Sequence, residues 1–233
     1  MIGTPDTRRA FGTGGSIVVE RCQVCGSTDL EPIFFAGYLP PVNTMPDIGV
    51  RPAEAPSYPA QLLRCKHCDL AQLGLIVDPQ ILFPPSYPYT SGTTRILREN
   101  FAELQREVAS LVGLAASDLV VDIGSNDGTL LGNFRDVGCR VLGVEPTDAG
   151  KLAIASGVPT ILRFFDGTVA REVLSAHGPA SIVTAANVFA HIEQIHDIVD
   201  AVDLLLDPNG VFITESHYFV SLLESLQYDT IYH

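Results

Sequence analysis

Basic residues are scarce in this 233-residue chain, and their scarcity limits the partners it can have. Lys and Arg number 14 against 27 Asp and Glu, which gives a formal net charge of −13 at pH 7 and a pI near 4.7. A protein that grips a phosphate backbone needs a basic surface. We therefore expect no nucleic-acid partner.

Long apolar runs are also missing. None approaches the roughly 18 residues of a membrane-spanning helix, and the N-terminus carries Arg8 and Arg9 without the continuous apolar stretch of a signal peptide. We expect a cytoplasmic protein with no membrane partner, and in that compartment paired cysteines are more often metal ligands than disulfides. The Gly- and Thr-rich residues 1–17 lack apolar periodicity, so we expect a disordered leader there.

The hydrophobic fraction of 46% is enough to bury the core of one large domain, alone or with a small satellite. An amphipathic helix is predicted over Arg95–Leu114, and beyond it apolar β runs alternate with helical patterns. The predicted strands are Leu119–Ile123, Val141–Glu145, Thr160–Phe164, Ile182–Ala186 and Val211–Thr214, with a turn at Asp207–Gly210 before the last. This alternation predicts a parallel sheet whose ligands bind beyond the C-terminal ends of the strands.

The junction after the first of these strands has the residues of a cofactor loop. Asp122 follows the apolar residues of the strand, and Gly124 and Gly128 come after it, so bare backbone N–H groups can approach a ligand. The dinucleotide pattern Gly-x-Gly-x-x-Gly is lacking, because Asn126 stands where its second glycine would be. Together with a second acid, Glu145, at the end of the next β run, the loop resembles the S-adenosylmethionine (SAM) site of class I methyltransferases. The alternative is an ordinary strand-to-helix turn with a buried polar cap.

Two Cys-x-x-Cys knuckles can supply four thiolates to a tetrahedral zinc ion. The interval of 39 residues between them is long, but the entropic cost of loop closure grows only logarithmically with length. Neither knuckle opens a helix after a strand as a redox pair would, the compartment disfavours two disulfides, and four unrelated buried cysteines would not form matched pairs. We predict a structural zinc ion bound by Cys22, Cys25, Cys65 and Cys68.

Other residues fall near the predicted ligand-binding edge of the sheet. Tyr87 and Tyr89 lie in a proline-rich stretch. This stretch is either a surface linker or a loop that binds the substrate, and both interpretations stay open. Asn187 ends the fourth β run and His191 follows it. A lone histidine is usually a structural residue, so structural and acceptor-site roles stay equally open for His191.

In their order along the chain, these motifs resemble the zinc-containing sugar C-methyltransferases, which act on nucleotide-linked (dTDP) deoxy-keto sugars. The set is the two knuckles, Tyr87-Pro-Tyr89, DIGSNDGTLL, GVEP, NVFAHI and QYDTIYH. The resemblance implies that Asp122, Gly124, Ser125, Asn126, Gly128, Glu145, Phe165 and Asn187 hold SAM, and that Tyr87, His191 and Tyr232 line the sugar site. It also implies proton abstraction from the carbon α to the ketone, followed by attack of the enolate on the SAM methyl group.

The expected fold is α/β: a class I methyltransferase Rossmann-like parallel sheet, incomplete at its C-terminus, with a small N-terminal zinc-binding module. We expect the zinc module with its substrate loop over 18–92, a linking helix over 93–117 and the SAM-binding domain over 118–233. The family pattern continues Tyr-x-Glu-His, with that His as the base, whereas this chain stops at His233. We therefore expect a truncated chain that binds zinc and, weakly, SAM without turnover. The alternatives are O- or N-methylation of another small molecule and a non-catalytic zinc- and SAM-binding module. The oligomeric state stays open.

Overall fold

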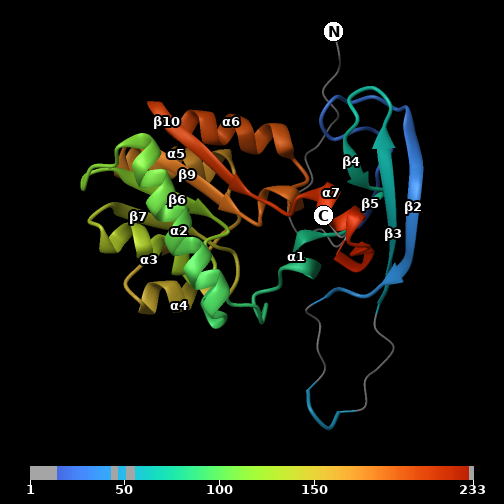
Figure 1. The fold of residues 1–233 in the computed structure, drawn as a ribbon, viewed down its shortest axis with the longest axis horizontal. Helices are drawn as coiled ribbons and strands as arrows, with labels where there is room; N and C mark the ends of the chain where they lie inside the picture. The colour runs from blue at the N-terminus through green and yellow to red at the C-terminus, as the bar shows by residue number, and fades with distance from the viewer. Residues whose placement is uncertain (1–14, 43–46, 51–55, 231–233) are drawn as a thin grey trace. The chain divides into compact units, whose positions relative to one another are not determined.

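The computed structural model describes residues 15–42, 47–50 and 56–230, which form two compact units (Figure 1). The first unit comprises the chain up to Pro84 together with the segment from Leu222 onward, and the second is the continuous stretch Pro85–Ser221. Most of the leader expected over 1–17 lies outside the described residues, as does Tyr232. The domain boundaries drawn from the sequence stay a prediction.

The first unit is built on two small antiparallel sheets. The larger has the strand order β2-β3-β4, formed by Leu30–Leu39, Tyr58–Cys65 and Ala71–Leu73. The smaller pairs β1, Ile17–Val18, with β5, Leu75–Ile76, and the short helix α1, Pro79–Leu82, follows. The 3-10 turn η3, Tyr228–Thr230, also belongs to this unit, and the Tyr228 ring packs edge to face on Phe34 of β2 with centroids 6.2 Å apart. An aromatic contact therefore ties the C-terminal segment to the N-terminal sheet.

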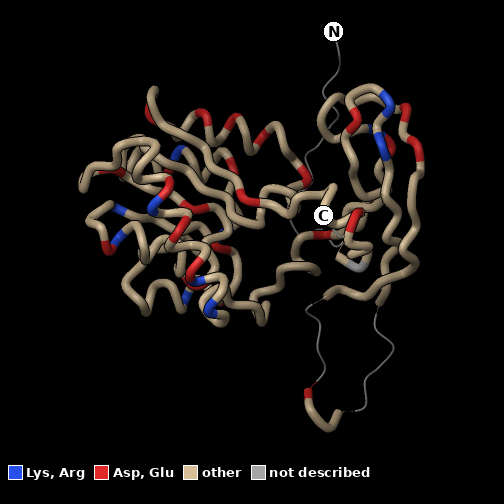
Figure 2. Tube along the Cα trace, in the orientation of Figure 1, with Lys and Arg blue, Asp and Glu red and all other residues tan. Residues whose placement is uncertain are grey.

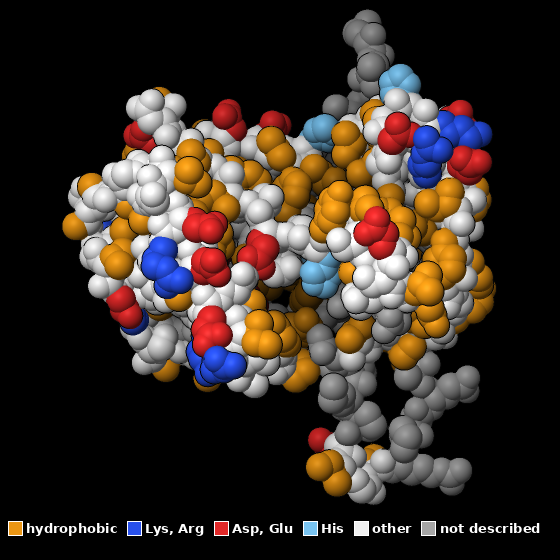
Figure 3. Space-filling view, viewed as in Figure 1, with side chains coloured by type: hydrophobic (Ala, Val, Ile, Leu, Met, Phe, Trp, Pro, Cys, Tyr) orange, Lys and Arg blue, Asp and Glu red, His pale blue; other side chains and the backbone are white. Residues whose placement is uncertain are grey.

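The edge strand β2 keeps large apolar side chains in solvent. Ile33, Phe34, Phe35 and Tyr38 are between 39% and 68% exposed. Figure 3 shows hydrophobic side chains gathered on the visible face of this unit. The strand therefore lacks the apolar-polar alternation of a half-buried strand.

The second unit contains a five-stranded, fully parallel sheet in the order β10-β9-β6-β7-β8. The strands are β6 Leu119–Ile123, β7 Arg140–Val144, β8 Thr160–Ile161, β9 Ala180–Ala186 and β10 Leu206–Glu215. The chain first winds outward from β6 through β7 to β8 and then crosses to β9 on the other side. Ligands of such sheets bind beyond the strand C-termini at this switch in direction.

Helices cover both faces of the parallel sheet, and all five residues of β6 are therefore buried. Leu119, Val121 and Ile123 pack with α5, Gly167–His177, and α6, Ile195–Leu205. Val120 packs on the opposite face. That face is covered by α2 Arg95–Val112, α3 Thr129–Asp136 and α4 Ala149–Ala155. The α/β class and the parallel sheet expected from the sequence are confirmed.

Three strands differ from their predicted lengths. β9 begins at Ala180, two residues before the predicted start at Ile182. β8 ends at Ile161 rather than at Phe164, because this edge strand pairs with β7 at two positions only. β10 begins at Leu206, so the stretch predicted as a turn, Asp207–Gly210, lies inside the strand, where the register with β9 shifts. Proline lacks the N–H that a strand ladder needs, and such irregularities accommodate it.

Acidic residues outnumber basic ones in the sequence, and Figure 2 marks both kinds along the backbone trace. Acidic side chains follow the outer face of α6, where Asp197, Asp200 and Asp203 are exposed, as their helical spacing predicts. Among the described residues, no helix has the length and apolar character needed to cross a membrane.

Candidate functional site

The four cysteines of the knuckles converge in the first unit. The Sγ atoms of Cys22 and Cys68 lie 3.6 Å apart, and those of Cys25 and Cys65 lie 3.5 Å apart. All four sulfurs lie within 4.8 Å of one another. A tetrahedral zinc ion with Zn–S bonds of about 2.3 Å separates its sulfurs by about 3.8 Å. The four thiolates therefore fit a structural zinc ion.

The two knuckles have the same backbone geometry. In each, the N–H of the first cysteine donates to the carbonyl five residues on, and its carbonyl accepts from the N–H four residues on. That fourth residue is Gly26 or Asp69, with φ of 72° or 63°. Pairing of Leu30 with Cys65 places the second knuckle at the start of β2. The β2-β3 hairpin therefore closes the long interval between the knuckles.

The thiols of this cluster differ in acidity. Burial acts to raise the pKa of Cys65, but the N–H groups of Cys68 and His67 and the neighbouring sulfurs lower it to about 6. The Leu70 N–H acts to lower the pKa of Cys68, but burial and the other three thiols raise it to about 12. At neutral pH the cluster therefore already holds a thiolate, the form that binds metal.

The loop after β6 depends on two glycines. At Gly124, φ is 69° and a Cβ would stand 2.5 Å from a methyl group of Val188. At Gly128, φ is 78° and a Cβ would stand 3.0 Å from the Cβ of Ala153. The N–H groups of Gly124 and Ser125 both donate to the Val144 carbonyl. The loop therefore turns tightly against its neighbours, with no space for larger side chains at the two glycines.

Asp122 is buried within β6, and its Oδ1 accepts a 2.6 Å hydrogen bond from the Thr184 hydroxyl of β9. Burial raises the pKa of Asp122 to about 7, the Thr184 hydrogen bond lowers it in part, and the charge of Glu145 raises it further. The carboxyl is therefore poised between its two protonation states at neutral pH. A nearby cation would favour the ionised form.

Glu145, which follows β7, is 5% exposed. Its Oε1 accepts from the N–H and the hydroxyl of Thr147 at 2.9 and 2.5 Å, and its Oε2 accepts from the Asn126 N–H at 2.9 Å. A carboxylate offers about four lone-pair sites, so the protein fills three and leaves one on Oε2. Glu145 thus orders the loop through these three hydrogen bonds.

Asn187 and Glu215 meet at the C-terminal ends of β9 and β10. The Asn187 Nδ2 donates to Glu215 Oε1 and the Asn100 Nδ2 of α2 donates to Oε2, both at 2.8 Å. Asn187 has φ of 57°, and its N–H donates to the Glu215 carbonyl. Left-handed non-glycine residues cluster at functional sites. The hydrogen bonds to Glu215 orient Asn187, which the sequence predicts to bind the cofactor.

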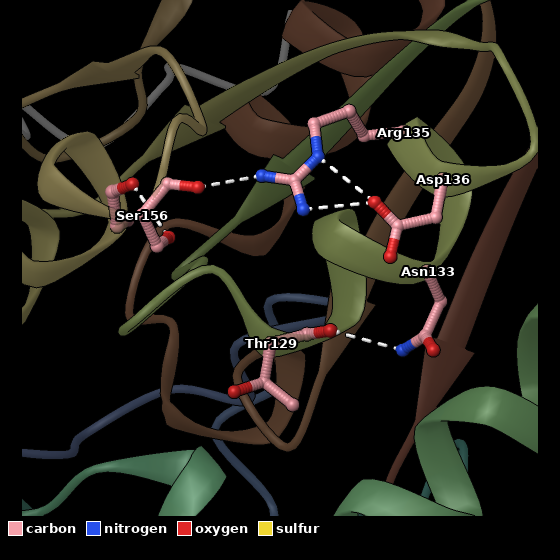
Figure 4. A network of polar contacts seen from close by, with 6 residues as sticks. Thr129, Asn133, Arg135, Asp136 and Ser156 are labelled. Carbon is pink, nitrogen blue, oxygen red and sulfur yellow. Dashed lines mark hydrogen bonds and ion pairs between the residues drawn. The ribbon is translucent and has the colours of Figure 1, made fainter.

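Helix α3, which follows the loop, is tied to α4 at its far end (Figure 4). The Arg135 guanidinium donates to Asp136 and to the Ser156 carbonyl, the latter at 2.6 Å, and Asn133 donates to the Thr129 carbonyl. Asp136 is exposed, and exposed ion pairs add at most about 1 kcal/mol to stability. The network fixes the helix beyond the loop without entering the site.

The other predicted residues take varied positions. The Tyr87 and Tyr89 rings lie edge to face, 6.4 Å apart, and His191 ends the 3-10 turn η2, Phe189–His191. Phe165 packs in the core beside α5. The Ser125 hydroxyl is buried and has no hydrogen-bond partner in the described part of the chain. The structure thus places Ser125 and Phe165 inside the fold rather than on its surface.

Three residues of the site were not found from the sequence, although two of them carried a signal. Thr184 is a polar residue inside an apolar run and pairs in register with Asp122. Glu215 ends its strand as an acid, at the same edge as the two predicted carboxylates. The third, Asp127, lies within the glycine loop, and its contact with Gly92 depends on a fold that brings distant segments together.

The strand order makes this an α/β protein of the kind that binds ligands at the C-terminal edge of its sheet, where Asp122 and Glu145 lie at the ends of adjacent strands. The chain belongs to the methyltransferase domain family, whose pattern matches residues 96–232, more than half of its length. A zinc binding domain family matches residues 22–83. The chain thus combines a SAM-dependent methyltransferase domain with a four-cysteine zinc module, as the sequence predicts.

The C-methyltransferase NovU from Streptomyces niveus is 34% identical over 217 residues, which are 92% of this chain and 51% of that protein. The chain therefore spans about half the length of this curated relative. Among solved structures, the PH0226 protein from Pyrococcus horikoshii OT3 is 20% identical with a TM-score of 0.48, over 59% of this chain and 62% of that one. The CcbJ methyltransferase from Streptomyces caelestis is 25% identical with a TM-score of 0.39, over 49% and 48%.

Proposed function

We propose that this chain supplies the zinc module and the donor site of an enzyme that methylates a carbon atom of a nucleotide-linked deoxy-keto sugar. The observation that carries the proposal is the 34% identity to a C-methyltransferase over 92% of the chain. The two family matches, over residues 22–83 and 96–232, include the four cysteines and the glycine loop.

The donor would lie at the C-terminal ends of β6, β7 and β9. SAM supplies a methyl group carried on a sulfonium cation. The carboxylate of Asp122 complements the positive charge of the donor, and Glu145 has a lone pair left for a ribose hydroxyl. The Gly124–Gly128 loop and Asn187 complete the proposed site. Phe165 and Ser125 would act from inside the fold, by packing against the elements that form it.

The acceptor would be gripped by Tyr87, His191 and Tyr232, of which Tyr232 lies outside the described residues. Methylation at carbon requires a base that removes the proton α to the ketone and groups that stabilise the enolate oxygen. Tyrosine hydroxyl and imidazole N–H groups can donate hydrogen bonds to such an oxygen.

Calorimetry of SAM binding tests the donor site, with S-adenosylhomocysteine (SAH), which lacks the sulfonium charge, as a second ligand. We expect the Asp122→Asn and Glu145→Gln variants to bind SAM about tenfold more weakly or worse, since each loses a charge-assisted interaction. Asp136→Asn is the matched control, because Asp136 is exposed on α3 and, within the described part of the chain, forms its ion pair with the neighbouring Arg135. Equal affinities for all four proteins would refute the assignment of the two acids.

Incubation in D2O with SAM and a dTDP-4-keto-deoxy sugar tests the acceptor. In a longer form that continues through the family's Glu-His and so supplies the base, we expect deuterium at the carbon α to the ketone and the transferred methyl group on that carbon, whereas this chain alone should show neither. A methyl group on oxygen or nitrogen would favour the alternative class of small-molecule methyltransferase. Donor binding by the longer form with neither deuterium exchange nor methyl transfer would favour a non-catalytic zinc- and SAM-binding module.

A further inference from the structure

The segment that carries Tyr87 and Tyr89 is bound directly to the donor loop. The Ser91 N–H donates to Asn126 Oδ1 at 2.9 Å, and Asn126 Nδ2 donates in return to the Tyr89 carbonyl at 3.1 Å. The next N–H, that of Gly92, donates to Asp127 Oδ2 at 2.8 Å. Two adjacent side chains of the loop thus make three hydrogen bonds to one stretch of four residues.

The same two residues also contact the proposed cofactor site and helix α3. The Asn126 N–H donates to Glu145 Oε2, the carboxylate oxygen that keeps a lone pair for the ligand. Asp127 Oδ1 accepts from both the N–H and the hydroxyl of Thr129, the first residue of α3. Asn126 and Asp127 therefore connect the donor side of the site with the tyrosine segment.

The tyrosine segment fits closely against this loop. Ser91 is 8% exposed, and a Cβ at Gly92 would stand 2.7 Å from the Thr129 hydroxyl and 2.9 Å from Asp127 Oδ2. At the other end of the segment, the Pro85 carbonyl accepts from the N–H of Asp148, three residues after Glu145. Both ends are therefore fastened to the loops that follow β6 and β7, with Tyr87 and Tyr89 between the fastening points.

The conformation of Asn126 supports a role beyond local structure. Its φ of 51° places a non-glycine residue in the left-handed region. Asparagine tolerates this region better than other residues with side chains, but glycine would adopt it without steric strain. A glycine here could take the same backbone conformation and would lack the side-chain hydrogen bonds to residues 89, 91 and 127.

We propose that Asn126 and Asp127 are positioning residues that couple the donor site to the Tyr87–Gly92 segment, so that bound donor fixes the two tyrosines for the acceptor. The inference rests on the proposed function of Glu145 and the glycine loop as the SAM site. A ligand hydroxyl on Glu145 Oε2 would restrain the Asn126 backbone, and the Asn126 side chain passes that restraint to Ser91 and Tyr89. Coupling of this kind is reciprocal, so an ordered segment also tightens donor binding.

Hydrogen exchange of the Ser91 and Gly92 amides, measured by NMR on this 25.0 kDa chain, tests the coupling. In the wild-type protein, saturating SAH is expected to slow exchange of both amides by about tenfold, a typical factor for coupled sites. In Asn126→Gly and in Asp127→Asn, exchange should be faster without ligand. When SAH binds, the additional protection of these two amides should be lost.

The two loop variants are chosen to remove side-chain hydrogen bonds without disrupting the fold. Asn126→Gly keeps the left-handed backbone, and Asp127→Asn keeps one acceptor oxygen where the carboxylate offers two. Asp136→Asn repeats the second substitution on α3 away from the loop and should retain the wild-type protection. If either loop variant fails to fold, the other variant and the wild-type response to SAH decide the outcome.

The outcomes distinguish this inference from the proposed function. If SAH binds the wild-type chain without slowing exchange at Ser91 and Gly92, the coupling is wrong and the donor site stands. If both loop variants keep the ligand-dependent protection, the two side chains do not transmit it. If calorimetry detects no SAH binding to the wild-type chain, the proposed function fails and the coupling fails with it.

Discussion

Replacement of Asp122 by Asn should change how the stability of the protein depends on pH. The carboxyl is buried in β6, and its pKa is raised from an ordinary value of 3.8 to about 7, chiefly by burial. Asparagine has nearly the same shape, can still accept from the Thr184 hydroxyl, and cannot ionise. The substitution therefore removes the titration and preserves the packing.

The raised pKa of Asp122 determines whether the stability of the protein rises or falls with pH. Between pH 4 and pH 7 the folded protein keeps the proton that the unfolded chain has lost, so stability falls as pH rises through this interval. The interval from 3.8 to about 7, at 1.36 kcal/mol for each pKa unit, corresponds to about 4 kcal/mol. Below pH 4 and above pH 7 this contribution no longer changes with pH.

Urea unfolding at a series of pH values from 4 to 8 measures the effect. The free energy of unfolding of Asp122→Asn minus that of the wild type should rise by up to about 4 kcal/mol between pH 4 and pH 7 and then level off. Titrating groups that do not interact with Asp122 cancel in this difference, and Asp136→Asn should show no comparable rise. A difference that is constant with pH would refute the assigned pKa and the burial argument behind it.

Four further results are expected. At pH 7, SAM binding should release protons because its cation favours ionised Asp122, so the binding enthalpy should differ between phosphate and Tris buffers in the wild type but not in Asp122→Asn. Cys65→Ser should lose the single zinc ion per chain in a metal-release colour assay, whereas Cys139→Ser, outside the cluster, should retain it. Glu215→Gln leaves one acceptor oxygen for two asparagine amides and should lower the free energy of unfolding in urea by about 1 kcal/mol. Phe134→Ala empties a fully buried position and should lower it by about 3 to 5 kcal/mol.

Features that depend on local sequence could be predicted. The βα alternation, the glycine loop and the start of β6 follow from residues within about 15 positions of one another, and the structure has them where the pattern places them. The four-cysteine cluster was also predictable, because two matched Cys-x-x-Cys knuckles together supply the four ligands of one zinc site. In both cases the residue types themselves restrict the geometry.

Features that depend on pairing between distant segments could not be predicted. Thr184 reaches Asp122 only because β9 lies beside β6 in one particular register, and Glu215 meets Asn100 although 115 positions separate them in the sequence. The stretch Asp207–Gly210 has a strong turn composition, yet pairing with β9 draws it into β10. In each case tertiary contact outweighs a local preference that the sequence shows in isolation.

The return of the chain to its first unit sets an order of events during synthesis. Residues on both sides of Pro85–Ser221 build that unit, and Tyr228 must reach Phe34 to join its two parts. A ribosome releases the whole second unit before it delivers Tyr228, and domains generally fold as units while the chain is still growing. The five described strands of the parallel sheet can therefore pair while the first unit still lacks the segment from Leu222 onward, so the unit that begins first gains this segment only after the second unit has been synthesised.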